Sequence, residues 1–289
     1  MLFEDAVSEY MADKSRRLRA TTLAGYESAI RCHLMPMWAG RELESIGLAE
    51  LQGWVDSIAL PGAARKAYKT FRQVYRWACR RHGLRVWDVT QGVELPRLPD
   101  GPKRALAASE ERETLRGIAG QEWEAVVLLA AALGLRRCEA CGMRWEDVDW
   151  RSGLVTVSRG LHWVGGREVV EPPKTRLAAR TLRLPRWALE RLRAIRGTRR
   201  NGRVCELPPH RVAARFRSFC RRNGLPWVPL GCLRHSWATI ALEAGAAIED
   251  VSVALGHSTV DTCIRHYLQS FTAVVGRASD AYSRAMLAG

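Results

Sequence analysis

The sequence predicts a mostly helical protein with a small antiparallel sheet in its second half. Apolar residues recur at helical spacing through the first 82 residues. A segment rich in proline and glycine, residues 83–104, then loses this pattern. Between residues 153 and 184 the period changes to the alternation typical of strands, and helical spacing returns after it. These observations indicate an all-helical first domain, a linker, and a second domain of mixed α and β structure.

Four helices are expected before the linker, over residues 2–14, 21–38, 49–58 and 63–82. Their apolar residues lie three or four positions apart, as Tyr26, Ile30 and Leu34 do in the second helix. Thr21 provides an N-cap for that helix, and Pro61-Gly62 separates the last two.

The outward face of the helix expected at 63–82 is basic, and no acidic residue interrupts it. Its candidate DNA-binding residues are Arg65, Lys66, Lys69, Arg72, Arg76 and Arg80, and Arg81 continues the face. Such a stripe is either an ordinary solvated face or a surface that follows a phosphate backbone. The complete absence of acidic residues favours the second interpretation.

We place the first domain at residues 1–98, the linker at 99–106 and the second domain at 107–289. The stretch from Glu122 to Leu133 is apolar on nearly all faces, which predicts a central buried helix. A turn at Gly134 leads from it into another short helix.

Three strands are expected in the second domain, at residues 154–157, 167–170 and 180–184. Gly165-Gly166 suits a hairpin turn. Helices resume near residues 185–195 and 208–222 and continue to the end of the chain.

The chain carries 45 basic and 30 acidic residues, a net charge of +15. An excess of this size indicates a polyanionic partner, with nucleic acid as the usual one. Most of the basic residues are arginine, which reflects either a GC-rich genome or selection for arginine chemistry.

The composition indicates a cytoplasmic protein without a membrane segment or a metal. The longest apolar run, 125–133, is far shorter than the roughly 20 residues of a membrane span, and the N-terminus lacks the pattern of a signal peptide. Eight cysteines without a secretion signal indicate free thiols. Cys138 and Cys141 have the spacing of half a zinc site, but no second pair follows, so core packing is favoured.

The residues near the C-terminus suggest chemistry on a phosphodiester. His257 is followed ten residues later by Tyr267, and Arg234 lies upstream at the start of an apolar helical run. A phenol with an ordinary pKa of about 10 becomes a useful nucleophile only beside groups that stabilise the developing charge. A phosphate held by planar guanidinium forks is a suitable target for it.

Four motifs in this order resemble the tyrosine recombinase (phage integrase) family. They are Gly134-Leu135-Arg136-Arg137-Cys138-Glu139, Lys174-Thr175 on a β-hairpin, Leu233-Arg234-His235, and Leu255-Gly256-His257 followed by Tyr267. The resemblance covers the whole chain in outline. It implies a helical, SAM-like core-binding domain followed by the catalytic domain.

The resemblance also implies a role for each matching residue. Tyr267 attacks the scissile phosphate and leaves a 3′-phosphotyrosyl bond and a free 5′-hydroxyl. Arg136 and Arg234 hold the non-bridging oxygens, His257 donates a further hydrogen bond to them, and Lys174 protonates the departing 5′-oxygen. Glu139 lies where the family often has a carboxylate that orients the site. Neither ATP nor a metal is required, so no cofactor is expected.

Other interpretations of these residues stay open. Arg136 could cap a helix, with Arg137 as the alternative phosphate ligand. Lys174 could be a solvated turn residue and His257 a helix cap. Tyr282 competes with Tyr267, but lacks an upstream histidine at the matching interval.

One position departs from the family pattern. The family usually has a histidine three residues before the second arginine, acting on the tyrosine proton, and here that residue is Gly231. Either water, His235 or another nearby group takes the proton, or the enzyme is slower than its relatives. Acid–base assistance is typically worth roughly 10²–10⁴-fold, so its loss should weaken activity without necessarily abolishing it.

The sequence therefore predicts a site-specific DNA recombinase of a phage or other mobile element, working through a Holliday junction. Its expected partners are double-stranded DNA at specific sites and, on paired sites, three further copies of itself in a tetramer. The protein is expected in the cytoplasm, associated with the nucleoid, and when it is not bound to DNA it would be a monomer or weak oligomer. Accessory DNA-bending or directionality factors could assist it. A C-terminal helix at 271–287 docks on its own domain or on a neighbouring copy. The rival functions are a type IB topoisomerase and a DNA-binding protein that has lost its chemistry.

Overall fold

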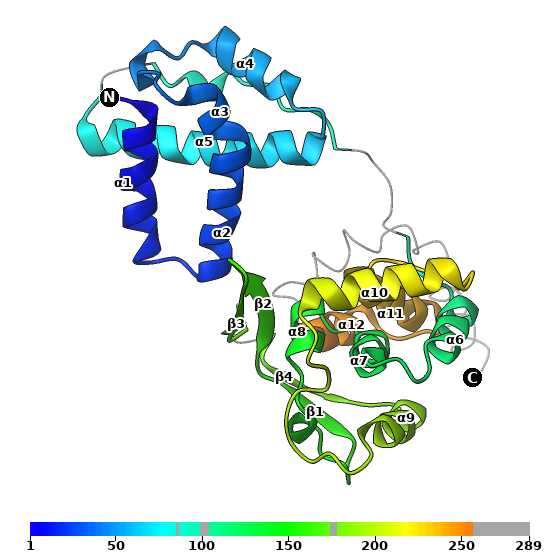
Figure 1. Ribbon diagram of the computed structural model, residues 1–289. Coiled ribbons are helices and arrows are strands. Elements are labelled where there is room, and N and C mark those ends of the chain that lie inside the picture. The colour runs from blue at the N-terminus through cyan, green and yellow to red at the C-terminus, as the bar shows by residue number, and fades with distance from the viewer. Residues whose placement is uncertain (85–86, 99–103, 174–177, 257–289) are drawn as a thin grey trace, which may run out of the picture. The chain divides into compact units, whose positions relative to one another are not determined.

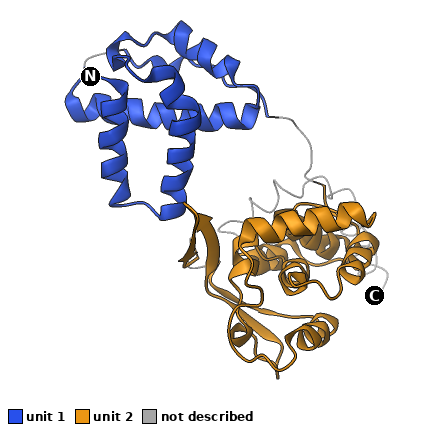
Figure 2. Cartoon of the chain, viewed as in Figure 1, with its two compact units in different colours: residues 1–101 blue, residues 102–289 orange. Residues whose placement is uncertain are grey.

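The two halves of the chain fold as separate units, residues 1–101 and 102–289 (Figure 2). The structure is a computed structural model that describes residues 1–84, 87–98, 104–173 and 178–256. Each unit buries its own hydrophobic cluster. The predicted class, mostly helical with a small antiparallel sheet in the second half, is confirmed, although the strands form two separate two-stranded sheets where one sheet was expected.

Unit 1 is built from helices packed around an aromatic core. The helices are α1 (Phe3–Ser15), α2 (Ala20–Ala29), α3 (Met35–Trp38), α4 (Leu48–Ser57) and α5 (Pro61–His82). The helix expected over 21–38 is divided, because a π-helical turn at Ile30–Leu34 separates α2 from α3. Pro36, which has no backbone N–H, lies in the first turn of α3, directly after the π-helical turn.

The long helix α5 runs across α1 and α2 (Figure 1). It begins at Pro61 and ends at Gly83, whose φ of +65° closes the helix in the left-handed conformation that glycine adopts readily. Phe71 lies at the centre of the core, with its ring centroid 5.4 Å from that of Trp38 and 5.6 Å from that of Phe3. Burying α5 against these rings leaves its basic face to solvent.

Unit 2 is organised around α7. Its helices are α6 (Ala108–Gly117), α7 (Glu124–Leu133), α8 (Arg137–Gly142), α9 (Arg186–Arg196), α10 (Pro209–Arg222), α11 (Leu233–Glu243) and α12 (Ile248–Leu255). Every residue of α7 is buried, as its continuous apolar sequence predicts. The buried carboxylate of Glu124 is stabilised by Arg191 of α9, whose Nη2 donates to Oε2 at 2.9 Å.

The strands form two antiparallel pairs. Strand β1 (Leu154–Val157) pairs with β4 (Arg180–Arg183), and β2 (Gly160–Val164) pairs with β3 (Arg167–Glu171). The expected hairpin turn at Gly165-Gly166 joins β2 to β3. No helix in the described part of the chain is long and apolar enough to cross a membrane.

Candidate active site

A sharp turn after α7 places Arg136 at the surface of unit 2. Gly134 ends α7 with a φ of +61°. A Cβ at this position would lie 2.8 Å from Leu255 Cδ2 and 3.0 Å from Trp237 Cε3, so any other residue would strain the backbone at this positive φ and displace these two side chains. The chain leaves the turn in an extended conformation, and α8 starts one residue after Arg136.

Arg136 is held by Glu139 at the first turn of α8. The backbone N–H of Arg136 donates to Glu139 Oε2 at 3.0 Å, and its Nη1 donates to Oε1 at 2.7 Å. The Glu139 side chain is only 6% exposed, whereas that of Arg136 is 39% exposed. Arg136 therefore stands at the edge of the protein and can still reach a ligand.

Arg180, which the sequence analysis did not single out, is the second partner of Glu139. It lies at the start of β4, and its Nη2 donates to Glu139 Oε2 at 3.1 Å. Burial by itself opposes ionisation of Glu139, but Arg180 and Arg136 outweigh it and hold the pKa of the carboxyl below its ordinary value. Glu139 is therefore a buried anion that fixes two arginines.

Arg234 lies in the first turn of α11 and is only 7% exposed. Its Nη1 donates to the carbonyl of Gly134 at 3.0 Å, and its Nη2 donates to the carbonyl of Leu255 at 2.6 Å. The guanidinium thus bridges the turn before Arg136 and the last residue of α12.

Three arginines meet at the end of α12. Arg180 Nε donates to the carbonyl of Ala254 at 2.6 Å, Arg234 Nη2 to that of Leu255, and Arg136 Nη2 to that of Gly256 at a long 3.5 Å. The last carbonyls of a helix lack helical partners and carry its negative dipole end, so cations are stabilised there. We call Arg136, Arg180 and Arg234 the arginine cluster. Glu139 is the carboxylate partner of Arg136 and Arg180, and among the described residues the three cations of the cluster face this one anion, which suits a phosphate ligand.

The structure brings some of the expected site residues together, while others lie outside the residues that it describes. Arg136, Arg234 and Glu139 converge, whereas Lys174, His257 and Tyr267 lie outside the described residues. The residue before His257 is Gly256, whose carbonyl receives Arg136. The chain therefore enters the histidine motif directly from the arginine cluster.

Three further positions bear on the alternatives. Arg137 is exposed, while Arg136 makes the contacts to Glu139 and Gly256. His235 is half-buried on α11. Gly231 is exposed in the 3-10 turn Leu230–Cys232, and a Cβ built there would meet no atom of the described part of the chain within 4 Å. The position offers room for a side chain but supplies no base.

Arg180 illustrates a residue that sequence patterns miss. An arginine in a strand with alternating burial is typical of a solvent-facing position. Its contacts join residues 41 and 74 positions away along the chain. A spacing pattern does not reveal such partners.

The cysteine pair of α8 has the environment of a core. Burial raises the pKa of Cys138, and burial together with the nearby Cys205 raises that of Cys141 to about 12. A thiol held in its protonated form is a poor metal ligand. Within the described ranges, no three His, Cys, Asp or Glu side chains come close enough to hold a metal ion.

The basic face of α5 divides into two groups. Lys66, Lys69, Arg72 and Arg80 are exposed. Arg65 Nε donates to the carbonyl of Pro96 at 3.1 Å, and Arg76 Nε donates to Asp88 Oδ2 at 2.7 Å. Arg65 and Arg76 therefore also hold the segment that follows α5 against the helix.

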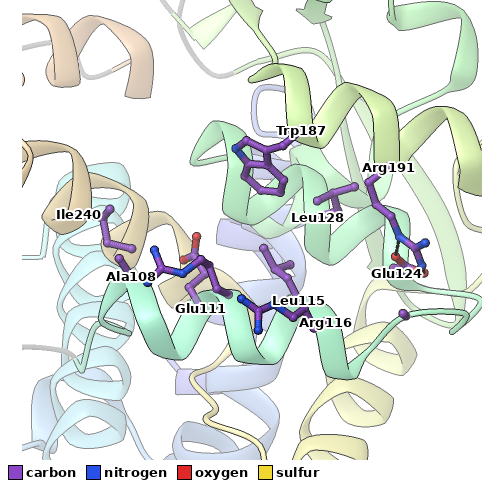
Figure 3. A pocket seen from close by; sticks show the side chains of 11 residues that line it. Ala108, Glu111, Leu115, Arg116, Glu124, Leu128, Trp187, Arg191 and Ile240 are labelled. Carbon is purple, nitrogen blue, oxygen red and sulfur yellow. Dashed lines mark hydrogen bonds and ion pairs between the residues drawn. The ribbon is translucent and has the colours of Figure 1, made fainter.

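A separate hollow of about 670 Å³ lies among α6, α7, α9 and α11 (Figure 3). Leu115, Leu128 and Ile240 contribute apolar walls, and no member of the arginine cluster lines it. Glu111 of α6 also lines it, and its buried Oε2 finds no hydrogen-bond partner among the described residues. Burial raises the pKa of Glu111 to about 7.

This carboxyl makes stability depend on pH. Because the pKa of Glu111 rises from 4.5 to about 7 on folding, the unfolded chain releases the proton more readily. The free energy of unfolding should therefore fall as the pH rises through this interval and level off above it. Glu111→Gln lacks this titrating group, so its free energy of unfolding should not show this fall. Relative to wild type, the free energy of unfolding of the variant should therefore rise by about 2 kcal/mol between pH 5 and pH 8. Urea unfolding at both pH values measures the difference. Glu113→Gln, which removes an exposed carboxylate from the same helix, should show no such gain.

Comparison with known proteins identifies relatives over most of the chain. Residues 104–273 match the Phage integrase family, and residues 2–59 match the phage integrase N-terminal SAM-like domain. The protein named for the phiRv2 prophage integrase of Mycobacterium tuberculosis is 25% identical over 277 residues, which cover 88% of this chain and 71% of that one. The tyrosine recombinase XerC of the same species is 29% identical over 252 residues, covering 77% and 79%.

Solved structures share the fold. The Tn1549 transposon integrase in complex with a circular intermediate DNA superposes with a TM-score of 0.81 at 15% identity, covering 96% of this chain and 99% of that one. A lambda integrase tetramer bound to a Holliday junction gives a TM-score of 0.68 at 17% identity, covering 91% and 77%. At these identities the likeness concerns the fold alone.

Proposed function

This chain belongs to the phage integrase family of tyrosine recombinases, and we propose that it cuts and rejoins DNA strands at specific sites through a 3′-phosphotyrosyl intermediate. The observation that carries the proposal is the convergence of Arg136 and Arg234 on consecutive carbonyls directly before His257. Two guanidiniums from different segments are thereby fixed at one place, as stabilisation of a transferring phosphoryl group requires.

In the proposed reaction the Tyr267 oxygen attacks the scissile phosphorus. The bond from phosphorus to the tyrosine oxygen forms, and the bond to the 5′-oxygen breaks. Arg136, Arg234 and His257 stabilise the charge on the non-bridging oxygens, and Lys174 gives a proton to the departing 5′-oxygen. The phenol proton goes to water or a nearby base, because Gly231 supplies none. Reversal by a 5′-hydroxyl from another strand rejoins the DNA, so the bond energy is conserved without ATP.

We infer that the substrate is double-stranded DNA bound by both units. The fold is shared with an integrase bound to a circular intermediate DNA and with a lambda integrase tetramer on a Holliday junction. We extend that assembly to this chain, with four copies on two paired sites of a phage or other mobile element. The net charge of +15 supports a DNA partner.

Covalent trapping on a denaturing gel tests the proposed reaction. The substrate is a nicked duplex that carries a terminal sequence of the element encoding this gene, labelled on the cut strand. Wild type should yield a protein–DNA adduct through a 3′-phosphate, and Tyr267→Phe sets the background. Strand exchange between two duplexes, as opposed to relaxation of a supercoiled plasmid alone, separates a recombinase from a topoisomerase. Binding to a footprinted site without any adduct would refute catalysis and leave a DNA-binding protein, the function that Gly231 favours.

The exposed half of the α5 face is proposed to contact DNA phosphates. Changing Lys69 and Arg72 together to glutamine should weaken binding to all sequences alike. It should also reduce the slope of log affinity against log salt by about 1.8, since each lost phosphate contact contributes about 0.9. Fluorescence anisotropy at several salt concentrations measures this slope.

Arg41→Gln provides the matched control, because Glu50 already accepts two hydrogen bonds from the Arg41 guanidinium. This variant removes a positive charge from the same unit, at a position that lies outside the α5 face and is already paired with a carboxylate. Since Arg41→Gln removes one charge and the test variant two, a reduction in slope of about 0.9 for Arg41→Gln would mean that overall charge, and not the α5 face, determines binding.

A further inference from the structure

The Arg180 side chain makes hydrogen bonds that pairing of its strand does not require. Its side chain is 7% exposed. Nε donates to the carbonyl of Ala254, Nη1 to that of Ala178 at 3.0 Å, and Nη2 to Glu139 Oε2. One guanidinium therefore ties β4 to α8 and to the end of α12. A buried charge costs free energy unless it is paired, and this one is paired on each of its nitrogens.

The contacts of Arg180 determine how Arg136 meets Glu139. Oε2 of Glu139 accepts from Arg180 Nη2 and from the Arg136 backbone N–H. The Arg136 side chain consequently meets Oε1 through Nη1 alone. An arginine beside a carboxylate usually closes a two-pronged fork on both oxygens. Here the second prong, Nη2, points instead to the carbonyl of Gly256, on the side where Arg234 lies.

We propose that Arg180 is a positioning residue for strand cleavage: by occupying Glu139 and the end of α12, it keeps Arg136 from closing on Glu139 and holds it beside Arg234. This inference rests on the proposed function, because Arg136 is the group that would touch the phosphate. Arg180 itself acts through Arg136 and is not a catalytic residue.

Removing Arg180 has two expected consequences. The Glu139 carboxylate loses one of its cationic partners, and Arg136 becomes free to form the fork with it. Among the described residues, the charged or titratable groups that face Glu139 are Arg136 and Arg180, with the Cys138 thiol on the same helix. Since Arg180 is one of the two cations that oppose the effect of burial, its loss should raise the pKa of Glu139.

The first experiment compares Arg180→Lys and Arg180→Gln in single-turnover cleavage of the nicked duplex. Lysine keeps the charge but cannot join three acceptors in one plane. Both variants should cleave more slowly, Arg180→Gln on the order of 100-fold, which is the effect of a small displacement of a reacting group. DNA affinity should stay near the wild-type value. Arg183→Gln is the matched control, since Arg183 is exposed on the same strand.

A double variant separates positioning from general damage. If Arg180 acts through Arg136, then Arg180→Gln should add little to the loss already caused by Arg136→Lys. Losses that multiply, or a fall in DNA affinity equal to the fall in rate, would overturn the proposal. Should Arg180→Gln fail to fold, Arg180→Met combined with Glu139→Gln removes both partners of the buried pair. This double variant should then cleave no more slowly than Glu139→Gln alone, and a further loss would count against the proposal.

A readout independent of activity separates this inference from the proposed function. Carbon-13 NMR of labelled glutamate side chains follows the titration of Glu139, assigned through Glu139→Gln. In Arg180→Gln the Glu139 pKa should rise relative to wild type. An unchanged titration in a folded variant would overturn the role of Arg180 even if wild type cleaves DNA. Absence of an adduct in wild type would instead refute the proposed function, and the titration would still show whether Arg180 holds Glu139.

Discussion

Replacing Arg234 with lysine is expected to slow phosphotyrosyl formation by roughly 100- to 1,000-fold, the usual cost of losing one preorganised donor to a developing anion. The Arg234 guanidinium reaches the carbonyls of Gly134 and Leu255, which belong to two different segments. A planar fork can span these acceptors and also face a phosphate, whereas an ammonium group is a single point of donation. Single-turnover cleavage of the nicked duplex measures the loss.

The position of Arg234 requires controls for folding. Because Arg234 is buried, lysine also leaves a carbonyl of the Gly134 turn with a poorer partner, at a cost of about 1–3 kcal/mol. Thermal unfolding and DNA affinity should therefore be measured with the rate. A loss of rate that vanishes once the unfolded fraction is subtracted would show that Arg234 is only structural.

Arg137→Lys is the matched variant for the arginine motif. Arg137 is exposed and adjacent to Arg136, so its replacement should leave cleavage near the wild-type rate. A larger loss in Arg137→Lys than in Arg136→Lys would make Arg137 the phosphate ligand and would contradict the assignment drawn from the contacts of Arg136.

The parts of the fold that follow from local patterns were predicted from the sequence. The burial of α7 follows from its unbroken apolar run, and the hairpin turn follows from Gly165-Gly166. Pairing between distant strands did not follow. Strand β1 pairs with β4, and the β2–β3 hairpin lies between them in the sequence. This pairing was not predicted, because alternation identifies a strand but not its neighbour.

The same distinction applies to the candidate site. Arg136, Glu139 and Arg234 were identified because they belong to short motifs with a known order. Arg180 belongs to no such motif, and its importance comes from the carbonyl of Ala254 and the carboxylate of Glu139, which only the folded chain brings to it. Motifs therefore indicate the groups proposed to touch the substrate and an orienting group close to them in sequence, such as Glu139, while an orienting group that is distant in sequence, such as Arg180, emerges only from tertiary contacts.

Gly231→His is expected to accelerate cleavage on the order of 100-fold, the lower part of the range for general acid–base assistance. Gly231 is exposed in the turn before α11 and does not have a positive φ, and no atom of the described residues lies within 4 Å of a Cβ built there. A histidine therefore fits without strain. It precedes Arg234 by three residues, at the position where the family usually has the residue that acts on the tyrosine proton.

The pH profile identifies the mechanism of the gain. An imidazole accepts the phenol proton only when it is neutral, so the acceleration should be present above a pKa of about 6.5 and lost below it. Gly231→Ala is the control for the backbone, since any side chain stiffens the unfolded chain. An equal gain in Gly231→Ala would mean that the turn, and not a base, limits the rate.

If Gly231→His brings no gain while wild type still forms the adduct, another group already takes the proton. His235, four residues further on, is then the first residue to replace, and a loss of cleavage in His235→Asn would identify it.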